Sequence, residues 1–285
     1  MAILVTGAKG MLGRDLCNYL RTHDHKVIEW DLPDHDITNV NPTISEIVRL
    51  KPETIFHLAA FTNVDGAEEQ RSEAYKVNTM GAWTVAIGAR DSGAELIYLS
   101  TDYVFDGAKA GPYVESDKTN PVNYYGMTKL LGEHAVIRET RKHYICRTSW
   151  LYGRHGRNFV DTIIGLAREK EFIEVVNDQQ GAPTYTRDLV PALAEFIGSH
   201  KHGIYHVTNS GVCSWFDFAR EVVRRAGLKT QVRPTTSDRY VRPAKRPAFS
   251  KLDTSLYELT FQRVVRPWQE GLQAYLEERN WLGAE

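Results

Sequence analysis

The chain has 285 residues, 42% of them hydrophobic and 25% charged, and a formal net charge of −1 at pH 7. This length allows one large domain or two and a sizeable buried core. The balanced charge gives no reason to expect a nucleic-acid or membrane partner, and no apolar run reaches the ~18 residues of a membrane-spanning helix. The N-terminus lacks the features of a signal peptide, so we expect a cytoplasmic protein.

From the N-terminus to about residue 150, short apolar runs alternate with segments whose apolar residues recur every three or four positions. This alternation predicts an α/β fold with a doubly wound parallel sheet of the Rossmann type, covered by helices on both faces. The expected strands are 2–6, 26–30, 54–59, 95–100 and 144–149, and the expected helices are 11–22, 43–51, 73–93 and 124–140.

After residue 150 the alternation loosens, and segments 177–188 and 232–253, rich in Pro, Thr and Arg, are interpreted as ordered loops. A strand near 203–208 is expected to return to the main sheet. We therefore predict a dinucleotide-binding domain over 1–150 and a smaller, loop-rich and mainly substrate-binding domain over 151–285.

A glycine-rich segment, VTGAKGMLGRDL, follows the first expected strand and opens the first helix. Glycines there permit a tight turn and let backbone N–H groups approach a pyrophosphate at the helix N-terminus. The spacing is one residue longer at its first step than the usual fingerprint, and a purely structural turn is the alternative. The predicted dinucleotide site comprises Gly7, Gly10, Met11, Leu12 and Gly13.

The second expected strand ends at Asp31, where an acidic side chain typically holds the adenosine ribose 2′-hydroxyl. A helix or turn cap is the alternative for Asp31. Its charge would repel a 2′-phosphate, whereas Lys9 in the glycine turn would attract one. We therefore expect NADH to serve as cofactor and leave NADPH open, with Asp36 and Ile37 placed beside the adenine.

Two residues in the segment NYYGMTKLLGE are predicted to carry acid–base chemistry. Tyr125 and Lys129 lie four residues apart, on one face of a helix, whereas Tyr124 has only Thr128 at that spacing. Lowering a tyrosine pKa by three units takes roughly 4 kcal/mol, which one ammonium about 4 Å away supplies at an effective dielectric near 20. We expect Tyr125 to be the acid–base group, and Lys129 to lower its pKa and bind the nicotinamide ribose.

With the glycine turn, this pair and a hydroxyl at the end of the fourth expected strand, the chain resembles the extended short-chain dehydrogenase/reductase superfamily. The resemblance implies that Thr101 binds the substrate oxygen as a third catalytic residue; a turn hydroxyl that caps its own backbone is the alternative. Dehydratases of the superfamily carry Thr-Asp-Glu at this strand end, but this chain has Tyr103 after Asp102. The missing base favours carbonyl reduction over elimination and leaves Asp102 to tune Thr101 or to bind the sugar.

Six stretches sharpen the resemblance to the dTDP-4-dehydrorhamnose reductase family: 57–68, 100–107, 123–133, 147–153, 177–189 and 203–211. The resemblance implies reduction of the C4 keto group of a nucleotide-linked 4-keto-6-deoxy hexose by NADH or NADPH, and it is compatible with a homodimer. The expected conversion is of dTDP-4-dehydro-L-rhamnose to dTDP-L-rhamnose. Another nucleotide-sugar epimerase or dehydratase, or a non-catalytic regulatory subunit on this fold, is the alternative.

The same resemblance places four consecutive residues along the cofactor and three residues around the deoxysugar. Trp150, just past a strand end, suits a sugar ring, but a bare tryptophan also suits a core. The C-terminal substrate loop has extra residues compared with the family pattern, so Arg242 is either a phosphate ligand or a surface arginine. The cofactor residues are Ala59, Ala60, Phe61 and Thr62, and the sugar residues are Thr62, Val64 and Trp150.

Neither the cysteines nor the histidines predict a metal site. Cys17, Cys146 and Cys213 are scattered and odd in number, which excludes a disulfide framework or a paired-cysteine site. The ten histidines show no ligand spacing, and SHKH at 199–202 is interpreted as a solvated loop between a helix and a strand. We expect no metal.

Overall fold

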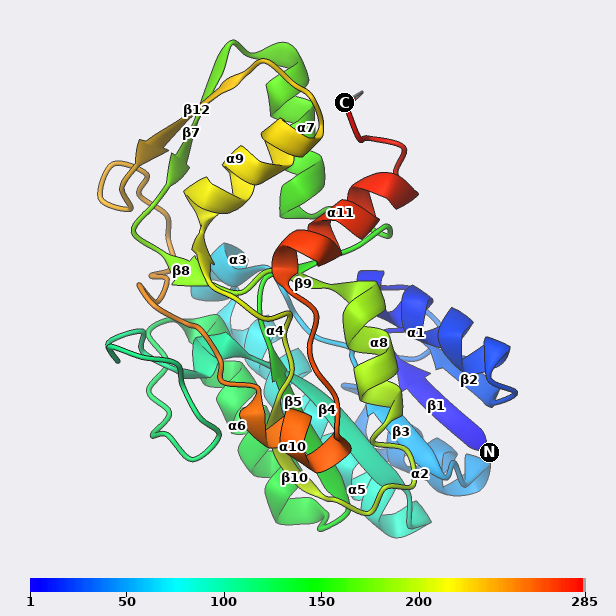
Figure 1. Ribbon diagram of the computed structural model, residues 1–285. Coiled ribbons are helices and arrows are strands. Elements are labelled where there is room, and N and C mark those ends of the chain that lie inside the picture. Colours follow the sequence, from blue (N-terminus) through cyan, green and yellow to red (C-terminus); the bar gives the residue numbers. More distant parts are fainter. Residues whose placement is uncertain (284–285) are drawn as a thin grey trace.

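The computed structural model describes residues 1–283 and is built around a parallel sheet of six strands (Figure 1). The strand order is β10-β5-β4-β3-β1-β2, and all neighbours are parallel. This confirms the predicted doubly wound sheet, including the strand that returns from the C-terminal half. The strands are β1 (Ala2–Thr6), β2 (Lys26–Trp30), β3 (Thr54–His57), β4 (Glu95–Thr101), β5 (His143–Thr148) and β10 (Gly203–His206).

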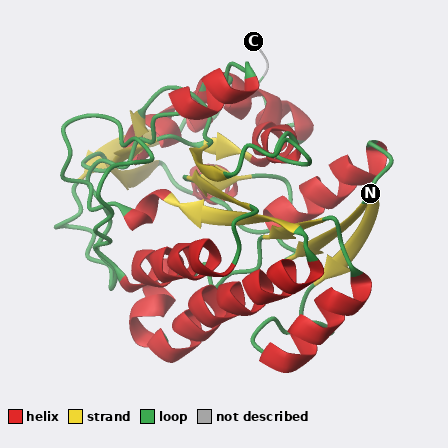
Figure 2. Cartoon of the chain, turned by 90° about the horizontal axis from the view of Figure 1, so that it is seen from below, coloured by secondary structure: helices red, strands yellow, loops and turns green. Residues whose placement is uncertain are grey.

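Helices lie on both faces of the sheet (Figure 2). Successive side chains of a strand point to opposite faces, so Ile3 and Val5 pack into one core and Leu4 into another. The first core is closed by α1 (Met11–Thr22), α8 (Thr186–Ala194) and α10 (Ser255–Phe261). The second is closed by α2 (Val40–Leu50), α5 (Ala82–Ser92) and α6 (Tyr124–Glu139).

The helix expected over 73–93 is interrupted. It comprises α4 (Arg71–Tyr75), a π-helical segment η1 (Lys76–Gly81) and α5, and the short α3 (Val64–Glu69) precedes it. In η1, the Asn78 amide accepts a hydrogen bond from the Phe61 backbone N–H at 2.8 Å and donates to the Thr128 hydroxyl at 3.0 Å. The wider turn thus ties the segment after β3 to α6, and π-helical turns of this kind occur often near functional sites.

A separate hydrophobic core lies at the top of Figure 1. There α7 (Phe159–Glu169), α9 (Trp215–Arg225) and α11 (Trp268–Glu278) pack with the parallel pair β7 (Phe172–Val176) and β12 (Gln231–Thr235). The short strands are β6 (Leu151–Tyr152), β8 (Gln180–Gly181), β9 (Thr184–Tyr185) and β11 (Cys213–Ser214), and the 3-10 turn η2 (Asp102–Val104) follows β4.

Both segments interpreted as loops contain regular structure, so the prediction was wrong there. The stretch 177–188 contains β8, β9 and the start of α8, and β12 occupies the beginning of 232–253. β12 pairs with β7 in a two-stranded sheet, and an edge strand tolerates its Pro234. The proline and threonine content therefore misled the interpretation.

The structure also bears on the expectations of no disulfide framework and no membrane-spanning helix. All three cysteines are free and buried, and burial raises the pKa of the Cys17 thiol to about 12, with the Glu29 charge raising it further. Within residues 1–283, none of the helices combines the length and the apolar character needed to span a membrane.

Candidate active site

The carboxyl ends of the central strands border a cavity of about 810 Å³. Parallel strands all end at the same edge of a sheet, and in open α/β sheets that edge is where ligands bind. The cavity brings together most residues predicted from the sequence: Gly7, Gly10, Met11, Leu12, Gly13, Asp31, Asp36, Ile37, Ala59, Ala60, Thr62, Thr101, Asp102, Tyr125, Lys129 and Trp150. Phe61, Val64 and Arg242 lie outside its lining.

The glycine turn fits a dinucleotide pyrophosphate. Gly7 has φ +72°, and a Cβ there would lie 2.7 Å from the Ala59 backbone nitrogen. A Cβ at Gly13 would lie 2.1 Å from the Gly7 carbonyl oxygen, so larger residues are excluded from both positions. Helix α1 begins after Gly10 without a hydrogen bond from a capping side chain and with no acidic residue in its first turn. Its N–H groups therefore stay available to an anion.

Asp31 makes the backbone contacts of a cap. Its carboxylate accepts hydrogen bonds from the Lys9 N–H at 2.7 Å and the Leu32 N–H at 2.8 Å, which joins the glycine turn to the end of β2. The Lys9 ammonium donates to the Leu32 carbonyl at 3.1 Å and lies 3.6 Å from the Asp34 carboxylate. Asp31 therefore stabilises the conformation of the glycine turn, in addition to any hydrogen bond with the adenosine ribose.

We expect Asp31→Ala to raise KM for NADH and for NADPH alike, by about tenfold. The reason is that hydrogen bonds to a charged group contribute about 1.5–3 kcal/mol, and their loss loosens the turn that both cofactors share. Steady-state kinetics with each cofactor measures this. A rise confined to NADH would instead show that the carboxylate acts only through the ribose hydroxyl.

Thr101, Tyr125 and Lys129 converge at the end of β4 and the first turns of α6. The Thr101 hydroxyl donates to Asp102 Oδ1 at 3.0 Å and accepts from the Tyr103 N–H at 3.2 Å, so it also makes the local turn contact named as the alternative. A hydrogen bond with Thr101 lowers the pKa of Tyr125, which links the strand-end hydroxyl to the phenol. All three side chains line the same cavity.

Burial dominates the acid–base behaviour of this site. It raises the pKa of Tyr125 above its ordinary value, and the Asp102 charge raises it further. The expectation of a lowered pKa was therefore wrong for the structure, because desolvation of the phenolate and the Asp102 charge both raise it. Burial also lowers the pKa of Lys129 to about 7, although the Glu133 charge opposes the shift. Tyr125 is thus held protonated at neutral pH, as a proton donor must be.

A buried ion pair between Glu133 and Arg147 lies near Lys129. Glu133, one turn further along α6, accepts two hydrogen bonds from the Arg147 guanidinium on β5, at 2.9 and 2.7 Å. The Ser100 hydroxyl on β4 also donates to Glu133. The bidentate geometry gives this pair directional specificity and fixes α6 against two strands. Lys129 is buried too, with its ammonium 4.0 Å from the centre of the Tyr98 ring.

Several lining residues were missed by the sequence reasoning. His35 stacks on Trp30 with ring centres 4.8 Å apart, and Ser149, Gly156 and Arg157 reach the cavity from the segments after β5 and β6. The sequence of these segments has no periodic pattern. Their approach to the glycine turn is therefore visible only in the folded structure. Arg157 adds a cation to the wall that contains Gly10.

Trp150 lines this cavity on the side of a second one of about 690 Å³. Its ring stacks on Trp215 with centres 3.6 Å apart and planes 6° from parallel, and Trp215 lines the second cavity. Trp150 has φ +49°, which non-glycine residues rarely adopt. Gly181 leaves room for it, since a Cβ there would lie 2.7 Å from the indole. These contacts fix the Trp150 ring between the first cavity and Trp215.

Arg242 belongs to the second cavity. Its Nε donates to the Asp65 carboxylate at 2.8 Å, and the Ala244 N–H donates to the same carboxylate at 3.2 Å. Arg246 also pairs with Asp65, and these contacts hold the pKa of that carboxyl well below its usual range. Arg242 therefore anchors the 240–246 segment to α3, beside Val64.

The fold and this site place the chain in the short-chain dehydrogenase/reductase class of nicotinamide-dependent oxidoreductases. Residues 1–280 match the model of the RmlD substrate binding domain family, and the chain belongs to that family.

Three relatives illustrate the likeness. A dTDP-4-keto-6-deoxy-D-glucose reductase of Streptomyces niveus is 40% identical over 271 residues, which cover 94% of each chain. The crystal structure of a dTDP-4-dehydrorhamnose reductase from Clostridium acetobutylicum is 43% identical, with a TM-score of 0.96 over 98% of this chain and 100% of that one. The Bacillus anthracis dTDP-4-dehydrorhamnose reductase, solved in complex with NADP, is 39% identical, with a TM-score of 0.94 over 97% of this chain and 99% of that one.

Proposed function

We propose that this protein reduces the C4 keto group of a dTDP-linked 4-keto-6-deoxy hexose. The expected reaction converts dTDP-4-dehydro-L-rhamnose into dTDP-L-rhamnose with NADH or NADPH. The observation that carries the proposal is that Thr101, Tyr125 and Lys129 line the same cavity as the glycine turn. The names of the Clostridium and Bacillus relatives support the choice of sugar.

In the proposed mechanism, Thr101 and Tyr125 donate hydrogen bonds to the C4 carbonyl oxygen. A dinucleotide held at its pyrophosphate by the glycine turn would supply a hydride from its reduced nicotinamide. Tyr125 gives its proton to the oxygen as negative charge develops there, and Lys129 stabilises the phenolate that remains. The hydride and the proton together convert the ketone into the C4 alcohol. The dinucleotide is left oxidised and Tyr125 is left as a phenolate, so charge and hydrogen balance.

Asp102 is available to the sugar. Burial raises the pKa of its carboxyl to about 7, and hydrogen bonds from Ser250 and Thr101 oppose the shift. Its Oδ2 has no hydrogen-bond partner in the described part of the chain. This oxygen is buried, so the Asp102 side chain must shift to offer it to a hydroxyl of the hexose, and such a partner would satisfy it.

We assign the deoxysugar to the space between Trp150 and Tyr125 and the nucleotide to the second cavity. Lys245 and Arg246 bring cations to that cavity, which suits a diphosphate, and Trp215 offers an aromatic face.

The direct test is an assay of cofactor oxidation with dTDP-4-dehydro-L-rhamnose, formed in situ by an upstream dehydratase and epimerase. NADH and NADPH are supplied in parallel, and omission of the epimerase offers the D-sugar named for the Streptomyces relative. We expect oxidation that depends on the epimerase. Oxidation without the epimerase would move the assignment to the D-sugar, and no oxidation by folded protein would contradict reduction.

A dehydratase or epimerase is the second candidate, and Tyr103 argues against the dehydratase. This residue occupies the position of the second carboxylate, and its ring contacts Tyr125 edge-on with centres 6.0 Å apart. Burial raises its pKa above the ordinary value, so it is no base at neutral pH. An epimerase returns the hydride it takes, so purified protein with bound NAD and no need for added cofactor would favour that candidate.

Asp65→Ala is expected to raise KM for the sugar nucleotide about tenfold and to leave KM for the cofactor unchanged. The substitution removes the acceptor that holds Arg242 and Arg246, so the wall of the nucleotide cavity loses its anchor. Steady-state kinetics measures both constants. Glu69→Ala on the same helix is the control, because Glu69 is exposed; equal effects of the two substitutions would contradict the role of the anchor.

The boundary between domains at residue 150, a homodimer and a cytoplasmic location stay predictions. Limited proteolysis tests the boundary, sedimentation equilibrium tests the dimer, and cell fractionation tests the location.

A further inference from the structure

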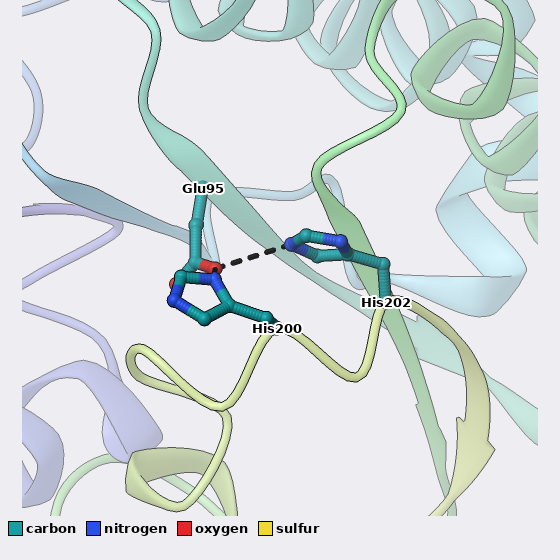
Figure 3. Close-up of side chains that lie close together, drawn as sticks. All are labelled: Glu95, His200 and His202. Atoms are coloured by element: carbon teal, nitrogen blue, oxygen red, sulfur yellow. Dashed lines mark hydrogen bonds and ion pairs between the residues drawn. The ribbon is translucent and has the colours of Figure 1, made fainter.

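Three potential metal ligands meet at the edge of the sheet opposite the catalytic cavity (Figure 3). Glu95 is the first residue of β4, whereas Thr101 is the last, so about 20 Å of strand separates the two ends. His200 and His202 lie on the segment that leads into β10. Glu95 Oε1 is 3.2 Å from His200 Nδ1 and 3.1 Å from His202 Nε2, and the three ligand atoms all lie within 4.8 Å of one another.

These separations suit a tetrahedral zinc ion. Zinc binds imidazole nitrogen at about 2.0–2.1 Å and carboxylate oxygen at about 2.0–2.2 Å, so adjacent ligands of a tetrahedron lie roughly 3.3–3.5 Å apart. The two measured separations fall just below this range. Two histidines and one glutamate with an open fourth position form a known zinc ligand set. The two histidine nitrogens lie within 4.8 Å of each other, so side-chain rotations can bring all three atoms to the distances that one ion requires.

Contacts around the cluster hold two of its ligands in place. The Gly198 N–H donates to Glu95 Oε2 at 2.9 Å, while Oε1 faces both histidines and makes a hydrogen bond with His202. The His202 ring packs beside Tyr144 with ring centres 5.0 Å apart. Partners of this kind fix the orientation of metal ligands in known sites.

The residue between the histidines adds no competing cation. Lys201 turns away from the cluster, where its ammonium donates to the Thr260 carbonyl at 2.6 Å and lies 4.9 Å from the Phe261 ring centre. Glu95 is buried, whereas the His202 side chain is 26% exposed and the His200 side chain is 79% exposed. The exposed side leaves solvent access for the ion and for a fourth ligand.

We propose that Glu95, His200 and His202 bind a divalent transition-metal ion, with Zn²⁺ as the best match and solvent as the remaining ligand. Imidazole ligands select against Mg²⁺, which prefers oxygen. The ion would join the start of β4 to the segment before β10 and so fasten the outer strand of the sheet. This role is structural and independent of the reductase activity.

The test uses full-length protein stripped of metal with a chelator and titrated with ZnCl₂ by calorimetry at pH 7.5. We expect one ion per chain, no measurable heat with MgCl₂, and a rise of roughly 4–5 °C in Tm at a zinc concentration a hundred times Kd. Co²⁺ in place of Zn²⁺ should give the visible absorption of a tetrahedral complex.

Two substitutions and one matched control complete the test. His202→Ala and Glu95→Gln should each weaken zinc binding at least about tenfold, as the loss of one ligand requires. His134→Ala, which removes an exposed histidine of α6, should change nothing. Undiminished binding in both ligand variants would assign the ion to other surface histidines and overturn the proposal. So would the absence of stoichiometric binding by the unsubstituted protein. Circular dichroism shows whether each variant is folded, and His200→Ala replaces any variant that is not.

Discussion

Tyr125→Phe is expected to lower kcat for sugar-dependent cofactor oxidation by about 10²- to 10⁴-fold, the usual contribution of a positioned proton donor. The substitution removes only the phenolic oxygen, and the ring still packs edge-on against Tyr103. Cofactor affinity should therefore stay close to its original value. Single-turnover kinetics and fluorescence titration with NADH measure the two quantities separately.

Tyr124→Phe is the control for this substitution. Tyr124 is the adjacent residue of α6, and its ring lies 5.1 Å from the Arg71 guanidinium rather than in the cavity. We expect it to retain turnover. Similar losses in both variants would point to damage of the helix start, and substantial turnover by Tyr125→Phe would remove Tyr125 as the proton donor.

Lys129→Met is expected to lower kcat/KM by up to about 10³-fold. One ammonium about 4 Å away stabilises a phenolate by roughly 4 kcal/mol at an effective dielectric near 20. The same reasoning predicts a pH dependence. Burial favours the neutral amine and brings the pKa of Lys129 to about 7, so the lysine is charged below that pH and neutral above it. The kcat/KM of the unsubstituted enzyme should fall as the pH rises through about 7.

Lys129→Arg separates charge from other causes of this fall. A guanidinium stays protonated throughout the range, so the fall near pH 7 should vanish even if the activity is lower at every pH. The measurement is kcat/KM between pH 5.5 and 9 under identical buffer conditions. An unchanged fall in the Arg variant would assign the titration to another group, and Asp102, with a pKa of about 7, is the first to examine.

The features that could be predicted from the sequence depend on local spacing. The glycine turn lies between β1 and α1, and Tyr125 and Lys129 lie four residues apart on α6, so neighbouring residues along the chain define both. Alternation of strand and helix patterns likewise predicted the sheet, because burial on both faces requires apolar runs. Even the returning strand β10 was recognisable as an apolar run.

The features that escaped prediction depend on residues far apart in the chain. Nothing near Asp65 indicates that it binds Arg242, and nothing near Glu95 indicates that two histidines approach it. The raised pKa of Tyr125 arises from desolvation, which depends on how the whole fold covers the phenol. Spacing reveals which residues share a helix face, but it does not reveal how much water they lose.

The position of β10 at one edge of the main sheet affects how the chain folds during synthesis. β5 ends at Thr148, but its outer neighbour begins only at Gly203, after more than fifty further residues. At 5–20 residues per second, the ribosome takes roughly three to ten seconds to make that stretch. During this interval the unpaired edge of β5 is a template for aggregation with another nascent chain. Chaperone demand should therefore be highest for ribosome-bound chains that end between these two strands.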